Sequence, residues 1–96
     1  MKSIPNKSFT TPDGSVVTVA QLLETSLSSP PPEGFDFATM RARLRVSAVL
    51  EAHKGIDGGV IELEDADYLT AQEAIKKTRW VRYSKHLVEF GELFGL

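Results

Sequence analysis

Residues 35–50 read FDFATMRARLRVSAVL, and this stretch decides the fold because it predicts the longest helix of the chain. Asp36 is a good N-cap, since its carboxylate can accept hydrogen bonds from the free N–H groups of the first turn. We expect the helix to run to about Lys54, with Gly55 as the left-handed residue after its end. At about 100° per residue, one face carries Phe37, Met40, Leu44 and Ala48, and the roughly opposite face carries Ala42, Val46, Val49 and Leu50. A helix that is apolar on two sides either lies at the centre of a fold or is covered by a partner on one side.

The residues before this helix predict a second, shorter helix and little else that is regular. Thr18 and Gln21 have the spacing of a capping box, and Val19, Leu22, Leu23 and Leu27 follow on one helical stripe. Residues 28–34 form a proline-rich spacer, in which three consecutive prolines end that helix. Residues 1–15 are expected to form an N-terminal arm and a turn, with a small hairpin or one short strand around Phe9.

The residues after it predict a strand and two more helices. Residues 60–63 read VIEL, a short strand that can pair with residues 16–19. A third helix, about 66–79, follows Asp65 as its cap, and a last helix begins after Ser84. The predicted fold class is therefore mainly α (α+β), with about four helices and a minimal two-stranded β element in a single domain of residues 1–96.

The composition is that of an ordinary globular protein. Apolar residues make up 42% of the 96 residues and charged residues 25%, which argues against a disordered chain. No apolar run is long enough to cross a membrane, and residues 1–5 lack the apolar region of a secretion signal. The net charge is −2, which argues against a protein that mainly coats nucleic acid. We therefore expect a cytoplasmic location and no membrane.

The acidic and histidine residues do not form a recognisable metal or catalytic pattern. No cysteine is present, and the acids between residues 55 and 75 do not follow the ligand order of an EF-hand. Glu62 and Glu64 alternate along the predicted strand, and His53 stands near a helix end without a nucleophile motif beside it. We expect no catalytic residue, no metal and no cofactor, and therefore no enzyme.

A basic segment with aromatic residues leaves nucleic-acid binding open as the alternative function. It contains Lys76, Lys77, Arg79, Arg82 and Lys85, together with Trp80 and Tyr83. Interleaved cations and aromatic rings can hold a phosphate backbone and stack on bases. The cations also complement the negative end of the third helix, and the neighbouring acids would repel the same polyanion. Nucleic acid is therefore the less favoured partner.

The chain resembles small proteins encoded by bacteriophages and prophages. The resemblance is carried by residues 35–44, FDFATMRARL, and residues 63–68, LEDADY, and it covers about residues 35–80 without a diagnostic motif. It implies a protein that assists virion assembly, or that binds one host or phage protein without catalysis. No functional residue is transferred by this resemblance.

Two observations favour a protein–protein interaction module. The long helix is apolar on two sides, and the acids between residues 55 and 75 are followed at once by the basic segment of residues 76–85. An interface needs an apolar centre with arginine or aromatic residues around it. The candidate partner-binding residues are Arg41, Arg45, Val46, Val49, Leu50, Trp80 and Tyr83. The expected function is a small phage or prophage accessory protein, or a virion-assembly protein, that binds a protein partner or associates with itself as an oligomer.

Overall fold

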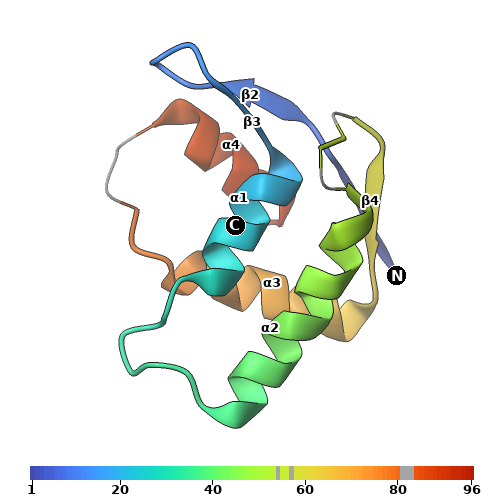
Figure 1. The fold of residues 1–96 in the computed structure, drawn as a ribbon, viewed down its shortest axis with the longest axis vertical. Helices are drawn as coiled ribbons and strands as arrows, with labels where there is room; N and C mark the ends of the chain where they lie inside the picture. Colours follow the sequence, from blue (N-terminus) through green and yellow to red (C-terminus); the bar gives the residue numbers. More distant parts are fainter. Residues whose placement is uncertain (54, 57, 81–83) are drawn as a thin grey trace.

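The structure is a computed structural model that describes residues 1–53, 55–56, 58–80 and 84–96. Its described residues form four α-helices and two small antiparallel sheets of two strands each (Figure 1), which confirms the predicted α+β class. The helices are α1 (Val19–Ser28), α2 (Phe37–Leu50), α3 (Asp65–Lys77) and α4 (Lys85–Leu93), with a short 3₁₀ helix η1 (Glu51–His53). The strands are β1 (Lys2–Pro5), β2 (Ser8–Thr10), β3 (Val16–Thr18) and β4 (Val60–Leu63).

The strands pair differently from the sequence expectation. Strand β4 pairs antiparallel with β1, with Ile61 opposite Ile4, whereas β3 closes a hairpin with β2, with Val17 opposite Phe9. The hairpin around Phe9 is confirmed, but the expected pairing of residues 60–63 with residues 16–19 is wrong. The turn between β2 and β3, in which the N–H of Thr11 donates to the carbonyl of Ser15 at 2.8 Å, brings β3 back beside β2, so β3 pairs with its neighbour in the chain. The N-terminal residues, expected as an arm, supply the partner of β4 instead.

Asn6 joins the two sheets to the rest of the molecule. Its side chain is almost fully buried, donates through Nδ2 to the carbonyl of Ile56 (3.1 Å) and accepts from the N–H of Ala20 (3.1 Å). Its backbone N–H donates to Gly59, and its carbonyl accepts from Gly58. One buried polar residue therefore holds both the start of α1 and the turn before β4, with each of these hydrogen bonds made inside the protein.

Helices α1 and α2 start where local sequence signals predict. Helix α3 begins at Asp65 itself, with Glu64 in the N-cap position and no side-chain cap bond, so the expected cap by Asp65 is wrong. Thr18 and Gln21 form the predicted capping box, with Oγ1 accepting from one N–H at 3.2 Å and Oε1 from the other at 2.9 Å. Asp36 accepts from the N–H of Thr39 at 2.7 Å and caps α2 as expected. Helix α2 ends earlier than predicted, at Leu50, and continues as η1; the expected end at Lys54 lies outside the described residues.

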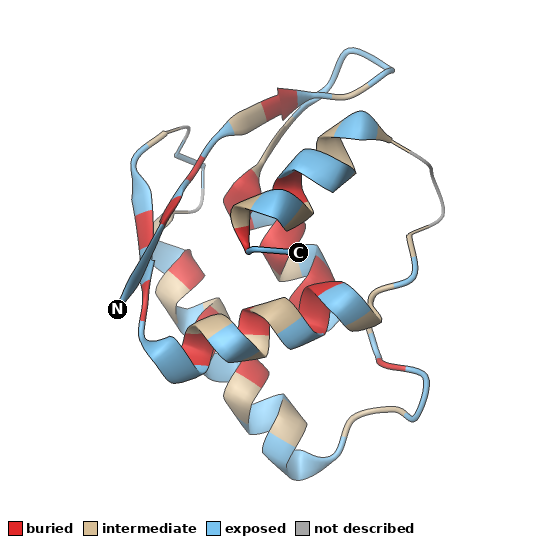
Figure 2. Cartoon of the chain, turned by 180° about the vertical axis from the view of Figure 1, so that it is seen from behind, coloured by how far each residue is buried: buried red, intermediate tan, exposed pale blue. Residues whose placement is uncertain are grey.

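The core lies between α1, α3, α4 and the inner faces of the strands. Its largest fully buried side chains include Leu23, Ile61, Leu63, Phe90 and Phe94. Trp80 and Phe94 each meet Phe90 edge-on, with ring centroids 6.3 and 5.5 Å apart. Helix α2 packs against α1 and α3 along one side. Figure 2 shows its N-terminal turns extending at one end of the molecule, mostly exposed or half-buried.

Candidate functional site

One apolar side of α2 is buried in the core, and the other is exposed. Val46 and Leu50 are buried in the chain's own core, and Val49 is half-buried against it. These three predicted partner residues therefore lie on the inner side of the helix, where Val46 and Leu50 offer no surface to a second molecule. The opposite side faces outward, with Phe37 80%, Leu44 67% and Met40 39% exposed.

We call this outward side the α2 outer face, formed by Phe37, Met40, Arg41, Leu44 and Ala48. Their spacing of three and four residues aligns them along the helix, over about 16 Å at 1.5 Å per residue. Arg41 is exposed in the middle of the row and forms no ion pair with any described residue. Arg45 flanks the row on the α3 side, where its Nε lies 3.5 Å from Asp67.

An apolar groove runs beside the α2 outer face, between α1 and α2. It has a volume of about 220 Å³, and its lining includes Leu27, Phe35, Met40, Arg43 and Leu44. Two side chains of the outer face therefore also form a wall of the groove. The sequence pattern did not reveal this groove, because its far wall comes from α1 and from the segment before α2.

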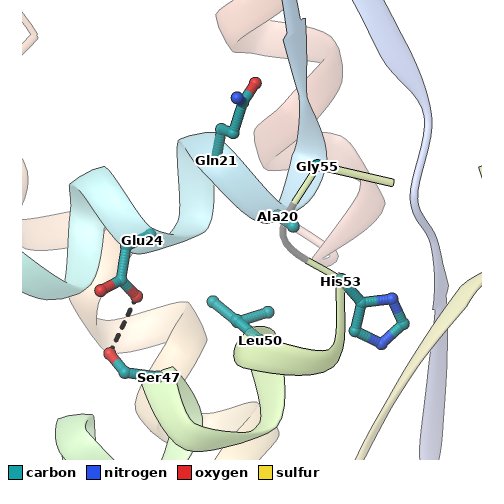
Figure 3. Close-up of a pocket in the computed structure, with 7 residues that line it drawn as sticks. All are labelled: Ala20, Gln21, Glu24, Ser47, Leu50, His53 and Gly55. Atoms are coloured by element: carbon teal, nitrogen blue, oxygen red, sulfur yellow. Dashed lines mark hydrogen bonds between the residues drawn. The ribbon is translucent and has the colours of Figure 1, made fainter. Parts of the chain in front are cut away.

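A second cavity of about 390 Å³ continues the line of the groove toward the other end of α2 (Figure 3). Glu24 and Ser47 line both spaces, and the hydroxyl of Ser47 donates to Glu24 Oε2 at 2.9 Å. Figure 3 shows the ring of His53 turned away from that pair. His53 makes no hydrogen bond to either residue, so the serine, histidine and carboxylate of this cavity do not form a nucleophile–base arrangement.

Arg43 lies between α2 and the end of α1, and the sequence pattern did not identify its role. Its Nη1 donates to the carbonyls of Ser26, Leu27 and Ser29 at 3.3, 3.2 and 2.9 Å. Its Nη2 is buried and has no hydrogen-bond partner among the described residues, and the ring of Phe35 lies 5.2 Å from the guanidinium carbon. Burial lowers the pKa of this guanidinium, while nearby carboxylates act in the opposite direction. The cation is held mainly by helix carbonyls.

The acids around the α2 outer face already have partners. They are Glu24 with Ser47, Glu33 and Glu73 with Lys77, Asp36 with the N–H of Thr39, and Asp67 with Arg45. Lys77 lowers the pKa of Glu33 by hydrogen bonding, and Glu33 raises the pKa of Lys77 in the same way. The charge left without a partner on this face is therefore the positive charge of Arg41.

The basic segment proposed for nucleic acid is spread over three elements. Lys76, Arg79 and Lys85 are exposed, whereas Lys77 bridges two acids. Trp80 is half-buried against the core. Arg82, as well as the candidate partner residue Tyr83, lies outside the described residues. Nucleic-acid binding stays a prediction, which a gel shift at low salt tests.

An open trough of about 520 Å³ lies between β2 and the start of α4. Within it Ser84 Oγ forms a hydrogen bond with His86 Nδ1, so that this N-cap residue makes no side-chain bond to the helix backbone. Among the described residues that line the trough, the one acid is Glu89, and its side chain is exposed. A hydrolase also needs a group that orients its base and donors for the anionic intermediate. The Ser84–His86 bond is local, and we assign it no catalytic role.

The described part of the chain contains no helix that is both long and apolar enough to span a bilayer. Within the same residues, no three histidine, cysteine or acidic side chains gather in a way that would hold a metal ion. No family model matches the chain, and searches of curated proteins and of solved structures returned no match.

Proposed function

We propose that the protein is a small non-catalytic interaction module that binds another protein through the α2 outer face. The observation that carries this proposal is the exposure of Phe37 and Leu44 on one side of a helix whose other side is buried in the core. Burial of a phenylalanine or leucine side chain stabilises a complex by about 1.5–3 kcal/mol each. The fully buried core of a protein interface is more apolar than its rim, and the α2 outer face with its groove offers such a core.

The position of Arg41 supports the same proposal. Arginine is enriched among the residues that dominate binding energy, because its flat guanidinium both stacks and donates hydrogen bonds. Arg41 lies within the apolar row, and Arg45 lies at its edge in contact with Asp67. Both were candidate partner residues, and both are exposed, so a partner that covers Phe37 and Leu44 would meet them.

The wider setting of the proposal comes from the sequence resemblance. Small phage and prophage proteins, as the resemblance implies, assist virion assembly or bind one host or phage protein. In this setting the protein would act in the host cytoplasm or in the virion, and its partner would be a host protein or a phage protein. The resemblance of residues 35–80 supports this setting.

A matched pair of variants tests the proposed surface. Leu44→Glu places a charge in the α2 outer face, and Leu69→Glu places the same charge at a leucine of α3 that is 64% exposed, against 67% for Leu44. Both variants should keep the wild-type circular dichroism spectrum and urea midpoint within about 0.5 kcal/mol, because both side chains are exposed. The bait is the full chain in extract from the source cell, with quantitative mass spectrometry.

The proposal expects one protein, or the chain itself, to be captured by wild type and by Leu69→Glu but about tenfold less by Leu44→Glu. Hydrogen exchange of the purified complex should then show protection at residues 37–48. Equal capture by both variants, or protection confined to another surface, would contradict the proposal.

A further inference from the structure

We propose that the segment bound by the α2 outer face is an amphipathic helix of another protein that carries carboxylates beside its apolar residues. This inference rests on the proposed function and adds the chemistry of the partner. It follows from the juxtaposition of an apolar groove with an exposed arginine that no described acid neutralises.

The shape of the site suits a helix laid along α2. The row from Phe37 to Ala48 covers three helical turns, so a partner helix of about four turns would cover it. The groove between α1 and α2 opens beside that row, and Met40 and Leu44 belong to both. An apolar side chain of the partner can therefore enter the groove while its neighbours one turn away cover Phe37 and Leu44, which is how amphipathic helices bind in grooves.

The charges select a partner with acids. Helix α2 contains Arg41, Arg43 and Arg45 and no acidic residue. The carboxylates of Glu24, Glu33, Asp36, Asp67 and Glu73 are already held by Ser47, Lys77, Thr39 or Arg45. A carboxylate on the partner would meet Arg41 at the edge of a dry apolar contact, where charge complementarity fixes orientation and raises the rate of association.

A second copy of this chain fits the site less well. Two α2 outer faces packed together would bring the two copies of Arg41 into one interface, and neither outer face has an acid to offset them. Like charges brought together at an interface cost several kcal/mol, about the contribution of one buried aromatic anchor. We therefore assign the site to a different chain, and self-association becomes an outcome of the test.

The test selects peptides directly on the folded chain. A display library of random peptides of about 16 residues, about 24 Å long as a helix, is selected on immobilised full-length wild type. Peptides that also bind Leu44→Glu are removed first. Synthetic copies of the remaining peptides are measured by fluorescence anisotropy against wild type, Arg41→Glu, Arg41→Gln and the control Lys85→Glu, an exposed cation on α4. Each measurement is made at low and at high ionic strength.

The inference expects selected peptides with apolar residues three and four positions apart and an excess of Asp and Glu. Their dissociation constants should rise about tenfold for Arg41→Glu and less for Arg41→Gln, with no change for Lys85→Glu. High salt should weaken binding to wild type more than binding to Arg41→Gln.

Three results of the peptide selection would overturn the inference. They are selected peptides without an acidic excess, equal binding to wild type and Arg41→Glu, and no peptide that depends on Leu44. A wild-type dimer in sedimentation that Leu44→Glu dissociates would also overturn it, because a second copy would then be the occupant. In each case the capture experiment with Leu44→Glu and Leu69→Glu judges the proposed function separately.

Discussion

The Nη1 of Arg43 lies 2.9 Å from the carbonyl oxygen of Ser29, so a side chain of α2 closes the C-terminal end of α1. The same nitrogen reaches the carbonyls of Ser26 and Leu27. The last carbonyls of a helix lack partners within the helix, and a cation is favourable at that negative end. Arg43 therefore fixes the two helices that form the walls of the apolar groove.

Replacing Arg43 by alanine should lower the free energy of unfolding by about 3 kcal/mol, because buried carbonyls of α1 lose their donor and a gap is left. The measurement is urea unfolding followed by circular dichroism. Arg41→Ala is the control, since this exposed side chain should change stability by less than about 0.5 kcal/mol. Equal losses for the two variants would mean that Arg43 does not hold the end of α1.

Replacing Asn6 by alanine should lower the free energy of unfolding by about 2–3 kcal/mol, because the N–H of Ala20 and the carbonyl of Ile56 lose their side-chain partner. Asn6→Asp keeps the acceptor but buries a charge. At neutral pH it should therefore be at least as unstable as Asn6→Ala, and its free energy of unfolding should recover partly in acid. Ser3→Ala on the exposed side of β1 is the control. A stability of Asn6→Ala within error of the Ser3→Ala value would show that water replaces these bonds.

The parts of the fold that sequence predicts well depend on neighbours in the chain. Thr18 and Gln21 are three residues apart and form the capping box that their spacing indicates. Asp36 caps α2 through Thr39, again three residues away. These two caps require only the local backbone, so residue type and spacing predict them; Ser84, with the same signal, bonds to His86 instead.

The parts that sequence does not predict depend on residues far apart in the chain. Strand β1 contains one buried residue, Ile4, which is too few for an alternating pattern that would indicate the partner of β4. Both sides of α2 are apolar, so periodicity does not tell which of them α1 and α3 cover. An arginine is rarely found on the covered side of a helix. Arg43 can lie there because the end of α1 supplies acceptors for its hydrogen bonds.

The free energy of unfolding should fall on acidification below about pH 4.5, which is the ordinary pKa of a glutamate such as Glu33. Hydrogen bonds from Lys77 and from the N–H of Thr39 lower the folded pKa values of Glu33 and Asp36. The unfolded chain therefore binds more protons in this range, and the stabilisation present at higher pH is lost as the pH falls through the folded values.

The urea midpoint measured against pH tests this expectation. Glu33→Gln and Asp36→Asn should each flatten the acid limb, and asparagine preserves the N-cap without a titrating group. Glu92→Gln, on α4 and away from both carboxylates, should keep the wild-type slope. An acid limb that is unchanged in Asp36→Asn and Glu33→Gln would assign the loss of stability to other groups.

Phe37 reports whether the α2 outer face is covered in solution, and Phe90, a core residue of α4, is the reference. Phe90 is fully buried between Trp80 and Phe94, so Phe90→Leu should lower the free energy of unfolding by about 1–2 kcal/mol. Phe37 is 80% exposed, so Phe37→Ala should change it by less than about 0.5 kcal/mol. The measurement is urea unfolding of the isolated chain at low concentration, where no partner covers the α2 outer face. If Phe37→Ala cost as much as Phe90→Leu, the chain itself would cover Phe37, and the apolar row that supports partner binding would not be available to a second molecule.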